Sequence, residues 1–254
     1  MDTSRTEMNN DDEVKKEEIS LETNQHKLCL MRSFVEKQDP NSKEVDDHIL
    51  NRFLRYRKLD VDKASYSFLN YLKWRQAVAP KGSISESEIL NELSQNKLFL
   101  QGFDKKRRPI AVSFYGRHVP INGTKSLDEL KRFWVYSLDK VCARMHNGQE
   151  QFSFIGDFKG WGFSNCDVKC CQEVLSILQD YYPEMLGQIY LINMPSIFRA
   201  IWKIIVPFIR KNTRKKLVFV EGKKVKSRLL EDIDEDQLAE IYGGKLALVP
   251  IEDS

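Results

Sequence analysis

The sequence contains no apolar run close to the roughly 18–20 residues that a helix needs to cross a bilayer. Its first residues are polar and acidic, which fits neither a secretory signal peptide nor an Arg-rich transit peptide. Both absences predict a cytoplasmic protein. With 254 residues, of which 41% are hydrophobic and 30% charged, the chain has the length and composition for one large domain, or for one large and one small domain.

Cysteine and histidine are scarce. The five cysteines are an odd number, which argues against a disulfide framework in a reducing compartment. Cys166, Cys170 and Cys171 lie close together but lack CxxC-like spacing and a fourth ligand, so we predict no metal site. The four histidines, His26, His48, His118 and His146, are scattered with no carboxylate at a telling interval, so each is expected to be structural or exposed.

Signatures of enzymes are missing as well. Gly156–Gly162 is glycine-rich and follows a predicted strand, but it matches neither GxGxxG nor GxxxxGK[ST]. Gly243-Gly-Lys245 is followed by Leu, so it is not a phosphate-binding loop. The chain has no GxSxG elbow and no HExxH helix. We predict a protein that is not an enzyme and has no cofactor.

Charge is present in a strongly uneven distribution. The segment 1–22 carries eight acids and three bases, a net charge of −5, so the remainder of the chain carries +8. Between Arg199 and Arg228 there are eleven bases and one acid, Glu221. Such a basic region indicates an anionic partner, either a membrane surface or a nucleic acid. Because no base-reading motif is visible, we expect no nucleic acid partner.

Periodicity divides the chain into three parts. Residues 1–24 show no apolar periodicity and are predicted to be a disordered acidic tail. Residues 25–95 are predicted to form a small all-helical module. Its helices begin near Lys27, at about Asp46 and after Asp60, which is predicted to be an N-cap, and a capping box at Ser85 opens a short fourth helix.

Residues 96–254 alternate strand and helix, which indicates an α/β fold with a mixed, mainly parallel sheet flanked by helices. Helices are expected at 126–145 and 167–182, the second capped by Asp167, and a helical stretch at 195–209. The predicted strands are Leu98–Gly102, Pro109–Phe114, Gln151–Asp157, Gln188–Asn193 and Lys216–Val220.

The stretch 195–210 is apolar on more than one face of a helix, with only a narrow polar edge of Arg199, Lys203 and Arg210. It is either a core helix buried on both sides, or a helix that lines a lipid cavity and also meets a membrane. In the second case Trp202 and the basic residues would lie at the level of the lipid headgroups. Pro207 would bend the helix and give it a mobile end. Periodicity alone does not choose between these alternatives.

Two polar segments are candidates for ligand binding. Lys211–Lys216 places a Thr among several bases at the entrance of a strand, an arrangement that can hold a phosphate or simply face solvent. Tyr181-Tyr-Pro-Glu184 ends a helix in a polar and aromatic corner. The role of Glu184 there depends on whether a ligand hydroxyl reaches it.

The order of these segments resembles the CRAL-TRIO family over about residues 25–250. No single motif is decisive, but their order and spacing together are specific, and the chain looks most like the compact single-domain members common in plants. In the helical part the matching segments are Asp46-Asp47, Arg52–Lys58, Asp60-Val61 and Lys73–Arg75. In the second part they are Arg108-Pro109, Gly156–Gly160, Tyr182–Gly187, Ile192–Pro195, Pro207-Phe208 and Tyr242–Gly244.

The resemblance implies a hydrophobic cavity that holds one lipid, with the sheet as its floor and the helix near 196–209 as a gate. The gate residues would be Phe198, Ile201, Trp202, Ile205 and Phe208. The resemblance also implies phosphatidylinositol as a ligand. Its headgroup would be bound by Arg57, Lys58, Glu184, Thr213, Lys216 and Asp104.

The chain departs from the family where some members bind phosphatidylcholine through four hydroxyl side chains. The matching positions would lie in the lipid cavity and are all apolar here: Leu100, Ala111, Phe152 and Phe154. The resemblance therefore argues against phosphatidylcholine as the second lipid. A carrier of a neutral ligand, such as a sterol, a tocopherol or another isoprenoid, is the alternative function. We expect a monomer that associates transiently with anionic membranes.

Overall fold

The computed structural model describes residues 22–146 and 148–254. The chain divides into two compact units, Met1–Lys73 and Trp74–Ser254, each of which is described by itself. Most of the predicted acidic tail, residues 1–21, lies outside the described residues. The predicted domain boundary between residues 95 and 96 stays a prediction.

The first unit is helical. Residues 22–38 form a helix that ends before Pro40, and a 3₁₀ turn, η1 (Pro40–Glu44), leads to α2 (Asp47–Tyr56). Asp46 caps α2 by accepting a hydrogen bond from the backbone of His48 at 2.8 Å. α3 (Val61–Val78) begins after Asp60, which accepts a bond from the backbone of Lys63 and was predicted as its cap. The buried core between these helices includes Met31, Leu50, Phe53, Ala64 and Phe68.

The second unit is built on a six-stranded sheet in the order β5-β4-β3-β2-β1-β6. β2, β3, β4 and β5 run parallel, whereas β1 is antiparallel to both β2 and β6. The predicted mixed, mainly parallel sheet flanked by helices is confirmed. The strands are β1 (Leu98–Phe103), β2 (Pro109–Phe114), β3 (Phe152–Asp157), β4 (Leu186–Ile192), β5 (Leu217–Val220) and β6 (Val249–Pro250).

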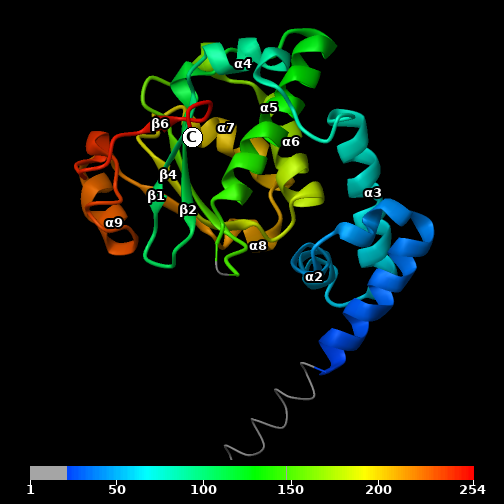
Figure 1. The fold of residues 1–254 in the computed structure, drawn as a ribbon. Coiled ribbons are helices and arrows are strands. Elements are labelled where there is room, and N and C mark those ends of the chain that lie inside the picture. The colour runs from blue at the N-terminus through cyan, green and yellow to red at the C-terminus, as the bar shows by residue number, and fades with distance from the viewer. Residues whose placement is uncertain (1–21, 147) are drawn as a thin grey trace, which may run out of the picture. The chain divides into compact units, whose positions relative to one another are not determined.

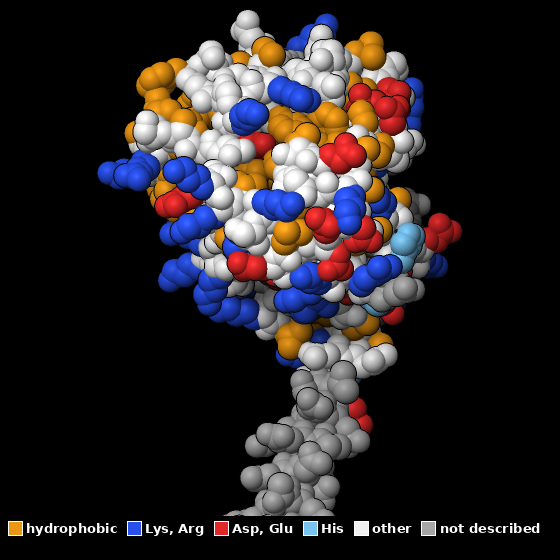
Figure 2. Space-filling model, turned by 90° about the vertical axis from the view of Figure 1, so that its left-hand side faces the viewer, with side chains coloured by type: hydrophobic (Ala, Val, Ile, Leu, Met, Phe, Trp, Pro, Cys, Tyr) orange, Lys and Arg blue, Asp and Glu red, His pale blue; other side chains and the backbone are white. Residues whose placement is uncertain are grey.

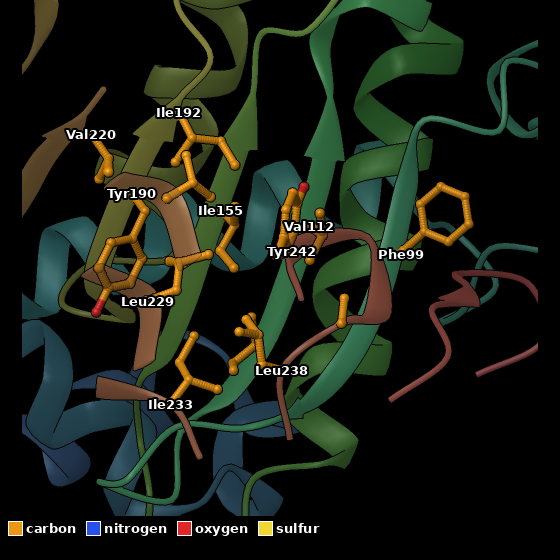
Figure 3. Packing of buried hydrophobic residues seen from close by; sticks show 13 residues of the cluster. Phe99, Val112, Ile155, Tyr190, Ile192, Val220, Leu229, Ile233, Leu238 and Tyr242 are labelled. Atoms are coloured by element: carbon orange, nitrogen blue, oxygen red, sulfur yellow. The ribbon is translucent and has the colours of Figure 1, made fainter. Parts of the chain in front are cut away.

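Helices cover both faces of the sheet (Figure 1). α5 (Gly123–Ala143), α6 (Val168–Ser176) and α7 (Phe198–Ile205) each follow one parallel strand and lie on one face, and α9 (Val225–Asp232) lies on the other. Figure 3 shows the core under α9, where side chains from the strands pack against Leu229, Ile233 and Leu238. Because side chains alternate along a strand, the intervening residues point to the face of α5, α6 and α7.

Several predicted helices differ in detail. The helix expected over residues 167–182 is an α-helix only to Ser176 and continues as a π-helix, η5 (Ile177–Tyr181). The stretch expected over 195–209 is α7 followed by a 3₁₀ turn, η6 (Val206–Phe208), because Pro207 has no N–H to continue the helix. The other short helices are η2 (Glu86–Glu88), α4 (Leu90–Ser94), η3 (Tyr115–Arg117), η4 (Phe163–Asn165), α8 (Lys211–Arg214), η7 (Gly222–Lys224) and η8 (Glu240–Tyr242).

Candidate functional site

A cavity of about 170 Å³ lies between the sheet and the helices α5, α6 and α7. Its floor is made by strand residues that point away from α9, among them Phe154, Ile189 and Leu191. Trp134 of α5 and Leu175 of α6 contribute to its walls. The lining is mainly apolar, so the cavity suits the hydrocarbon part of a ligand.

Phe154 is the predicted cavity residue that lines this space. Leu100, Ala111 and Phe152 are buried. Phe99 and Ile110, which directly precede Leu100 and Ala111, belong to the core under α9, as does Ile155, which directly follows Phe154. Alternation therefore places Leu100 and Ala111 on the same face as Phe154. Their assignment to a lipid cavity stays a prediction.

α7 closes one side of the cavity. Of the predicted gate residues, Phe198, Ile201, Trp202 and Ile205 line the cavity, and Phe198 is buried. Phe208 lies beyond the end of α7, and its side chain is 47% exposed.

The expectation that Trp202 lies at the level of the headgroups stays a prediction: its side chain is half-buried and also lines an open groove beside Arg199 and Lys203. Its ring packs on Phe198 at 5.6 Å between centroids and against Phe219 at 5.1 Å. The apolar side chains exposed on this segment are Ile204, at 50% exposure, and Phe208. Phe198 and Trp202 pack against neighbouring aromatic rings. The exposed side chains of Ile204 and Phe208 are instead available for contact with another apolar surface.

The end of this segment is tied to the π-helix η5. The amide of Gln179 donates to the carbonyl of Phe208 at 3.0 Å, and its oxygen accepts from the backbone of Arg210 at 2.7 Å. The guanidinium of Arg210 binds the carboxylate of Asp180. Arg210, expected to face a membrane, therefore fastens the chain after α7, a role that sequence reasoning missed because the partners are some thirty residues away.

Polar groups gather at the edge of the sheet where β2, β4 and β5 begin. Lys216 directly precedes β5, and its Nζ lies 3.8 Å from Oε2 of Glu184, near the start of β4. Burial lowers the pKa of Lys216 and the cation of Arg108 lowers it further, against the opposing effect of Glu184. Two of the predicted headgroup residues, Glu184 and Lys216, are thus brought together by the parallel pairing of their strands.

Arg108 belongs to this cluster although the sequence analysis did not place it there. It lies across β4, because a Cβ at Gly187 would stand only 2.5 Å from its Nη1. Its Nε donates to Oδ2 of Asp104 at 2.6 Å, and both side chains are buried. The advance signals were that Arg108 directly precedes a strand and that Arg108-Pro109 matches a segment of the family.

The carboxylate of Asp104 accepts four hydrogen bonds within the chain. Its Oδ1 accepts from the backbones of Lys106 and Arg108, and its Oδ2 accepts from Arg108 and from the hydroxyl of Ser153. These bonds fix Arg108 and the turn before β2. The contribution of Asp104 to headgroup binding stays a prediction, and its clearest role in the structure is to position Arg108.

Thr213 connects the polar cluster to the cavity. It lies in α8 and lines the cavity, and its carbonyl accepts a hydrogen bond from the backbone of Lys216 at 3.0 Å. Arg57 and Lys58 lie in the first unit, where Nε of Arg57 donates to Ser67 at 2.8 Å. Lys58 has a φ of +53°, so the chain turns sharply after α2.

A second polar cluster lines another part of the cavity. Lys97 is paired with Glu92 at 2.7 Å, and its Nζ lies 3.1 Å from Nδ1 of His118. Nε2 of His118 faces Oδ2 of Asp167 at 3.4 Å. Burial lowers the pKa of His118, and Lys97 lowers it further.

This cluster also contains a group of possible metal ligands. One ligand atom each from His118, Asp167 and Cys170 lie within 4.8 Å of one another. Asp167 is already occupied by the backbone N–H groups of Cys170 and Ile121, as expected of the predicted cap of α6. Burial raises the pKa of Cys170, which disfavours the thiolate that binds metals. The cluster is therefore a hydrogen-bonded group, and the prediction of no metal site stays a prediction.

The lowered pKa of His118 predicts that the protein loses stability in mild acid. In the unfolded chain this histidine takes up a proton near pH 6.5, but in the fold it does so only at lower pH. The unfolded state then binds more protons, so the free energy of unfolding should fall as pH falls below about 6.5, by at most about 1.4 kcal/mol per pH unit from this group. Urea unfolding between pH 7 and 5 would measure it. His118→Gln should flatten the slope, and equal slopes in the variant and the wild type would contradict the assignment.

An open groove of about 1550 Å³ lies at the opposite edge of the sheet, beyond the carboxyl ends of β3, β4 and β5. Lys159, Arg199 and Lys203 line it and have no ion-pair partner among residues 22–146 and 148–254. Phe219 adds an apolar side chain that is 49% exposed. Figure 2 shows the face that carries α9, with Lys and Arg side chains standing among exposed hydrophobic ones. The groove has the composition of a surface for an anionic, partly apolar partner.

Within the part of the chain that the structure describes, no helix is both long and apolar enough to cross a membrane.

Comparison with known proteins identifies the family. The sequence model of the CRAL/TRIO domain matches residues 93–244, and the chain belongs to this family, as the resemblance predicted. The Sec14 cytosolic factor of Schizosaccharomyces pombe is 29% identical over 238 residues, covering 87% of this chain and 82% of that protein. The phosphatidylinositol/phosphatidylcholine transfer protein SFH12 of Arabidopsis thaliana is 29% identical over 239 residues, covering 85% of this chain.

The chain spans only 42% of SFH12 and 40% of its Arabidopsis relative SFH7, so it matches part of those longer proteins. The crystal structure of Sfh5 superimposes with a TM-score of 0.62 over 80% of this chain and 73% of that one, at 22% identity. This similarity shows the fold.

Proposed function

We propose that this chain binds phosphatidylinositol and exchanges it at membranes, without covalent chemistry. The observation that carries the proposal is the position of Thr213, which lines the apolar cavity and is hydrogen bonded to Lys216 of the polar cluster. A phospholipid needs both environments at once, an apolar space for its acyl chains and a cation for its phosphodiester. The names of SFH12 and its relatives, which are phosphatidylinositol/phosphatidylcholine transfer proteins, support this reading.

The headgroup would meet Lys216 through its phosphate, while Glu184 would accept hydrogen bonds from inositol hydroxyls. Arg108, held by Asp104, would add positive potential to the same edge of the sheet. The family resemblance adds the hydroxyl of Thr213 to this set. The assignment of Arg57 and Lys58, which belong to the first unit, stays a prediction. These roles agree with an anionic ligand that also carries hydroxyl groups.

Exchange requires α7 to move. Ligand sites for small molecules usually have about 300 Å³ or more, whereas the cavity has about 170 Å³. A lipid with two acyl chains therefore fits only when α7 shifts outward, which would separate Ile201 and Ile205 from the sheet. Each CH₂ of the lipid that is buried in the cavity contributes about 0.8 kcal/mol. Because the membrane provides a similar apolar environment, the free energies of the acyl chains in the protein and in the membrane are nearly equal. The headgroup therefore sets the selectivity.

The surface around α7 suits a transient contact with an anionic membrane. Ile204 and Phe208 would enter the interface, and Arg199 and Lys203 would lie at the level of the headgroups. We infer a cytosolic monomer that visits membranes. The name of the S. pombe relative, Sec14 cytosolic factor, supports the cytosolic location. Contact with an anionic membrane accounts for the unpaired cations of the groove, so the proposal needs no nucleic acid partner.

Two measurements test the proposal. Mass spectrometry of lipid co-purified from cells should find phosphatidylinositol, and the purified chain should move labelled phosphatidylinositol between vesicles. Recovery of only a neutral lipid, with no transfer of phosphatidylinositol, would favour the second candidate function, a carrier of a neutral ligand. The apolar residues Leu100, Ala111, Phe152 and Phe154 support that candidate.

A further inference from the structure

The start of α7 is held in place by aromatic packing. The ring of Phe198 lies 4.7 Å from that of Phe158 between centroids, and the ring of Trp202 lies 5.1 Å from that of Phe219. Among the described residues, no side-chain hydrogen bond or ion pair joins the segment 195–205 to another part of the chain. This end of the helix is therefore held by apolar contacts.

The chain after η6 is held by hydrogen bonds instead. Gln179, the buried middle residue of the π-helix η5, donates to the carbonyl of Phe208 at 3.0 Å and accepts from the backbone N–H of Arg210 at 2.7 Å. Arg210 donates in turn to the backbone carbonyl of Gln179 and to the carboxylate of Asp180. These contacts of Gln179 and Arg210 form a polar latch between η5 and the chain that follows η6.

A break in the helix separates α7 from the polar latch. α7 ends at Ile205, and Pro207 lacks the N–H that would continue it, so the chain passes through the short turn η6. Hinges in proteins are usually a few residues of this kind at the end of an element, about which the rest of the element moves as a body. The turn lies directly before the polar latch, so a hinge there would have a fixed base.

Contact with a bilayer affects the two kinds of contact differently. Acyl chains are as apolar as the rings that hold Phe198 and Trp202, so α7 loses little when it exchanges these rings for lipid. Acyl chains offer no hydrogen-bond partner, so breaking the bonds of Gln179 beside them would leave buried polar groups unpaired. At a membrane the start of α7 can therefore separate from the sheet while the polar latch stays closed.

We propose that Gln179 and Arg210 are positioning residues for lipid exchange, which fix the chain after η6 so that α7 opens by swinging its N-terminal end away from the sheet. This inference rests on the proposed exchange of lipid through α7, and it adds the direction of the movement and the residues that set it. The opening then forms at the edge of the sheet where β3, β4 and β5 end, beside the cations Lys159 and Arg199 of the open groove.

Spin labels carried by a non-canonical amino acid measure this movement in the full chain. One label at Lys169, an exposed position on α6, is the reference for a second label at Ala200, near the start of α7, or at Lys211, directly after the polar latch. Vesicles of phosphatidylcholine and phosphatidylserine should add a longer distance between positions 169 and 200 and leave the distance between 169 and 211 unchanged. Equal movement at 200 and 211, or no movement at 200, would overturn the proposal.

Gln179→Met tests the polar latch itself, because methionine has nearly the same length and makes neither hydrogen bond. In solution this variant should lose the lipid that co-purifies with it about 10-fold or more faster than the wild type, since two net hydrogen bonds are removed. Mass spectrometry over time measures the loss. Arg210→Lys, which keeps a cation beside Asp180, should behave more like the wild type than Arg210→Met does. Gln76→Met is the matched control, because Gln76 is an exposed glutamine that also donates to a backbone carbonyl, that of Pro80 at 3.3 Å.

The outcomes separate this inference from the proposed function. Transfer of phosphatidylinositol by a chain whose α7 moves equally at both ends would overturn the polar latch and leave the proposed function standing. Movement at position 200 alone, in a chain that transfers no phosphatidylinositol, would support the polar latch and contradict the proposed function. Loss of lipid by Gln179→Met at the wild-type rate would remove Gln179 from the polar latch. The spin labels report on a chain with both positioning residues in place, so the test stays decisive even if Gln179→Met fails to fold.

Discussion

Replacing Lys216 with methionine should reduce transfer of phosphatidylinositol between vesicles by at least about 10-fold. Methionine keeps the apolar stem, which packs in a half-buried position, and removes only the charge that the phosphodiester would meet. A hydrogen bond between charged groups contributes about 1.5–3 kcal/mol, which corresponds to a loss of roughly 10-fold or more. The measurement is the initial transfer rate of labelled phosphatidylinositol.

The neighbouring Lys215 provides the matched control, because it carries the same charge, is exposed, and has no ion-pair partner among the described residues. Lys215→Met should transfer at close to the wild-type rate. Because the pKa of Lys216 is lowered by burial, binding in the wild type should weaken with rising pH before an ordinary lysine loses its proton, and this trend should be absent in Lys216→Met. Equal transfer by both variants would remove Lys216 from the headgroup site.

Local patterns predicted much of the fold. The caps Asp60 and Asp167 were predicted from single residues ahead of apolar periodicity, and both make the expected hydrogen bonds. The central strands were predicted to within a few residues, because buried parallel strands form continuous apolar runs. Both signals lie within a few neighbours in the sequence, which is why the sequence alone reveals them.

Elements stabilised mainly by distant contacts were missed. α9 has only two buried residues, Val225 and Leu229, and no local pattern separates it from a charged loop. β6 has two residues and exists because it pairs with β1, some 150 residues earlier. The local sequence does not indicate such pairings.

The candidate site was predicted only in part, because several of its contacts join residues that are distant in the sequence. Glu184 and Lys216 were identified through the family resemblance, and the parallel pairing of β4 and β5 brings them together. The contacts of Asp104 with Arg108 and Ser153, and of Arg210 with Gln179 and Asp180, depend on tertiary structure that no motif encodes. The contacts of Trp202 could not be predicted, because an almost wholly apolar helix gives no periodic signal for its inner face.

Mutations on the outer surface of α7 and η6 should also have a large effect on lipid transfer. Ile204→Asp combined with Phe208→Asp should slow lipid transfer by at least about 10-fold. Both side chains are about half exposed, and inserting such residues into an interface contributes on the order of 1.5–3 kcal/mol each when burial is complete. The two new carboxylates would also be repelled by anionic lipid, at about 1 kcal/mol per charge near the surface. Co-sedimentation with anionic vesicles and the transfer rate would measure the two consequences.

Neither Ile204 nor Phe208 lines the cavity, so lipid already bound should be retained by the double variant. Leu90→Asp, which places a carboxylate at an equally exposed leucine on α4, controls for the added charge and should leave transfer unchanged. Added salt should weaken membrane binding of the wild type by screening Arg199 and Lys203. If the double variant binds vesicles and transfers lipid as the wild type does, α7 does not meet the membrane through this surface. If it loses its bound lipid instead, these residues support the closed cavity, and the segment returns to the role of a core helix.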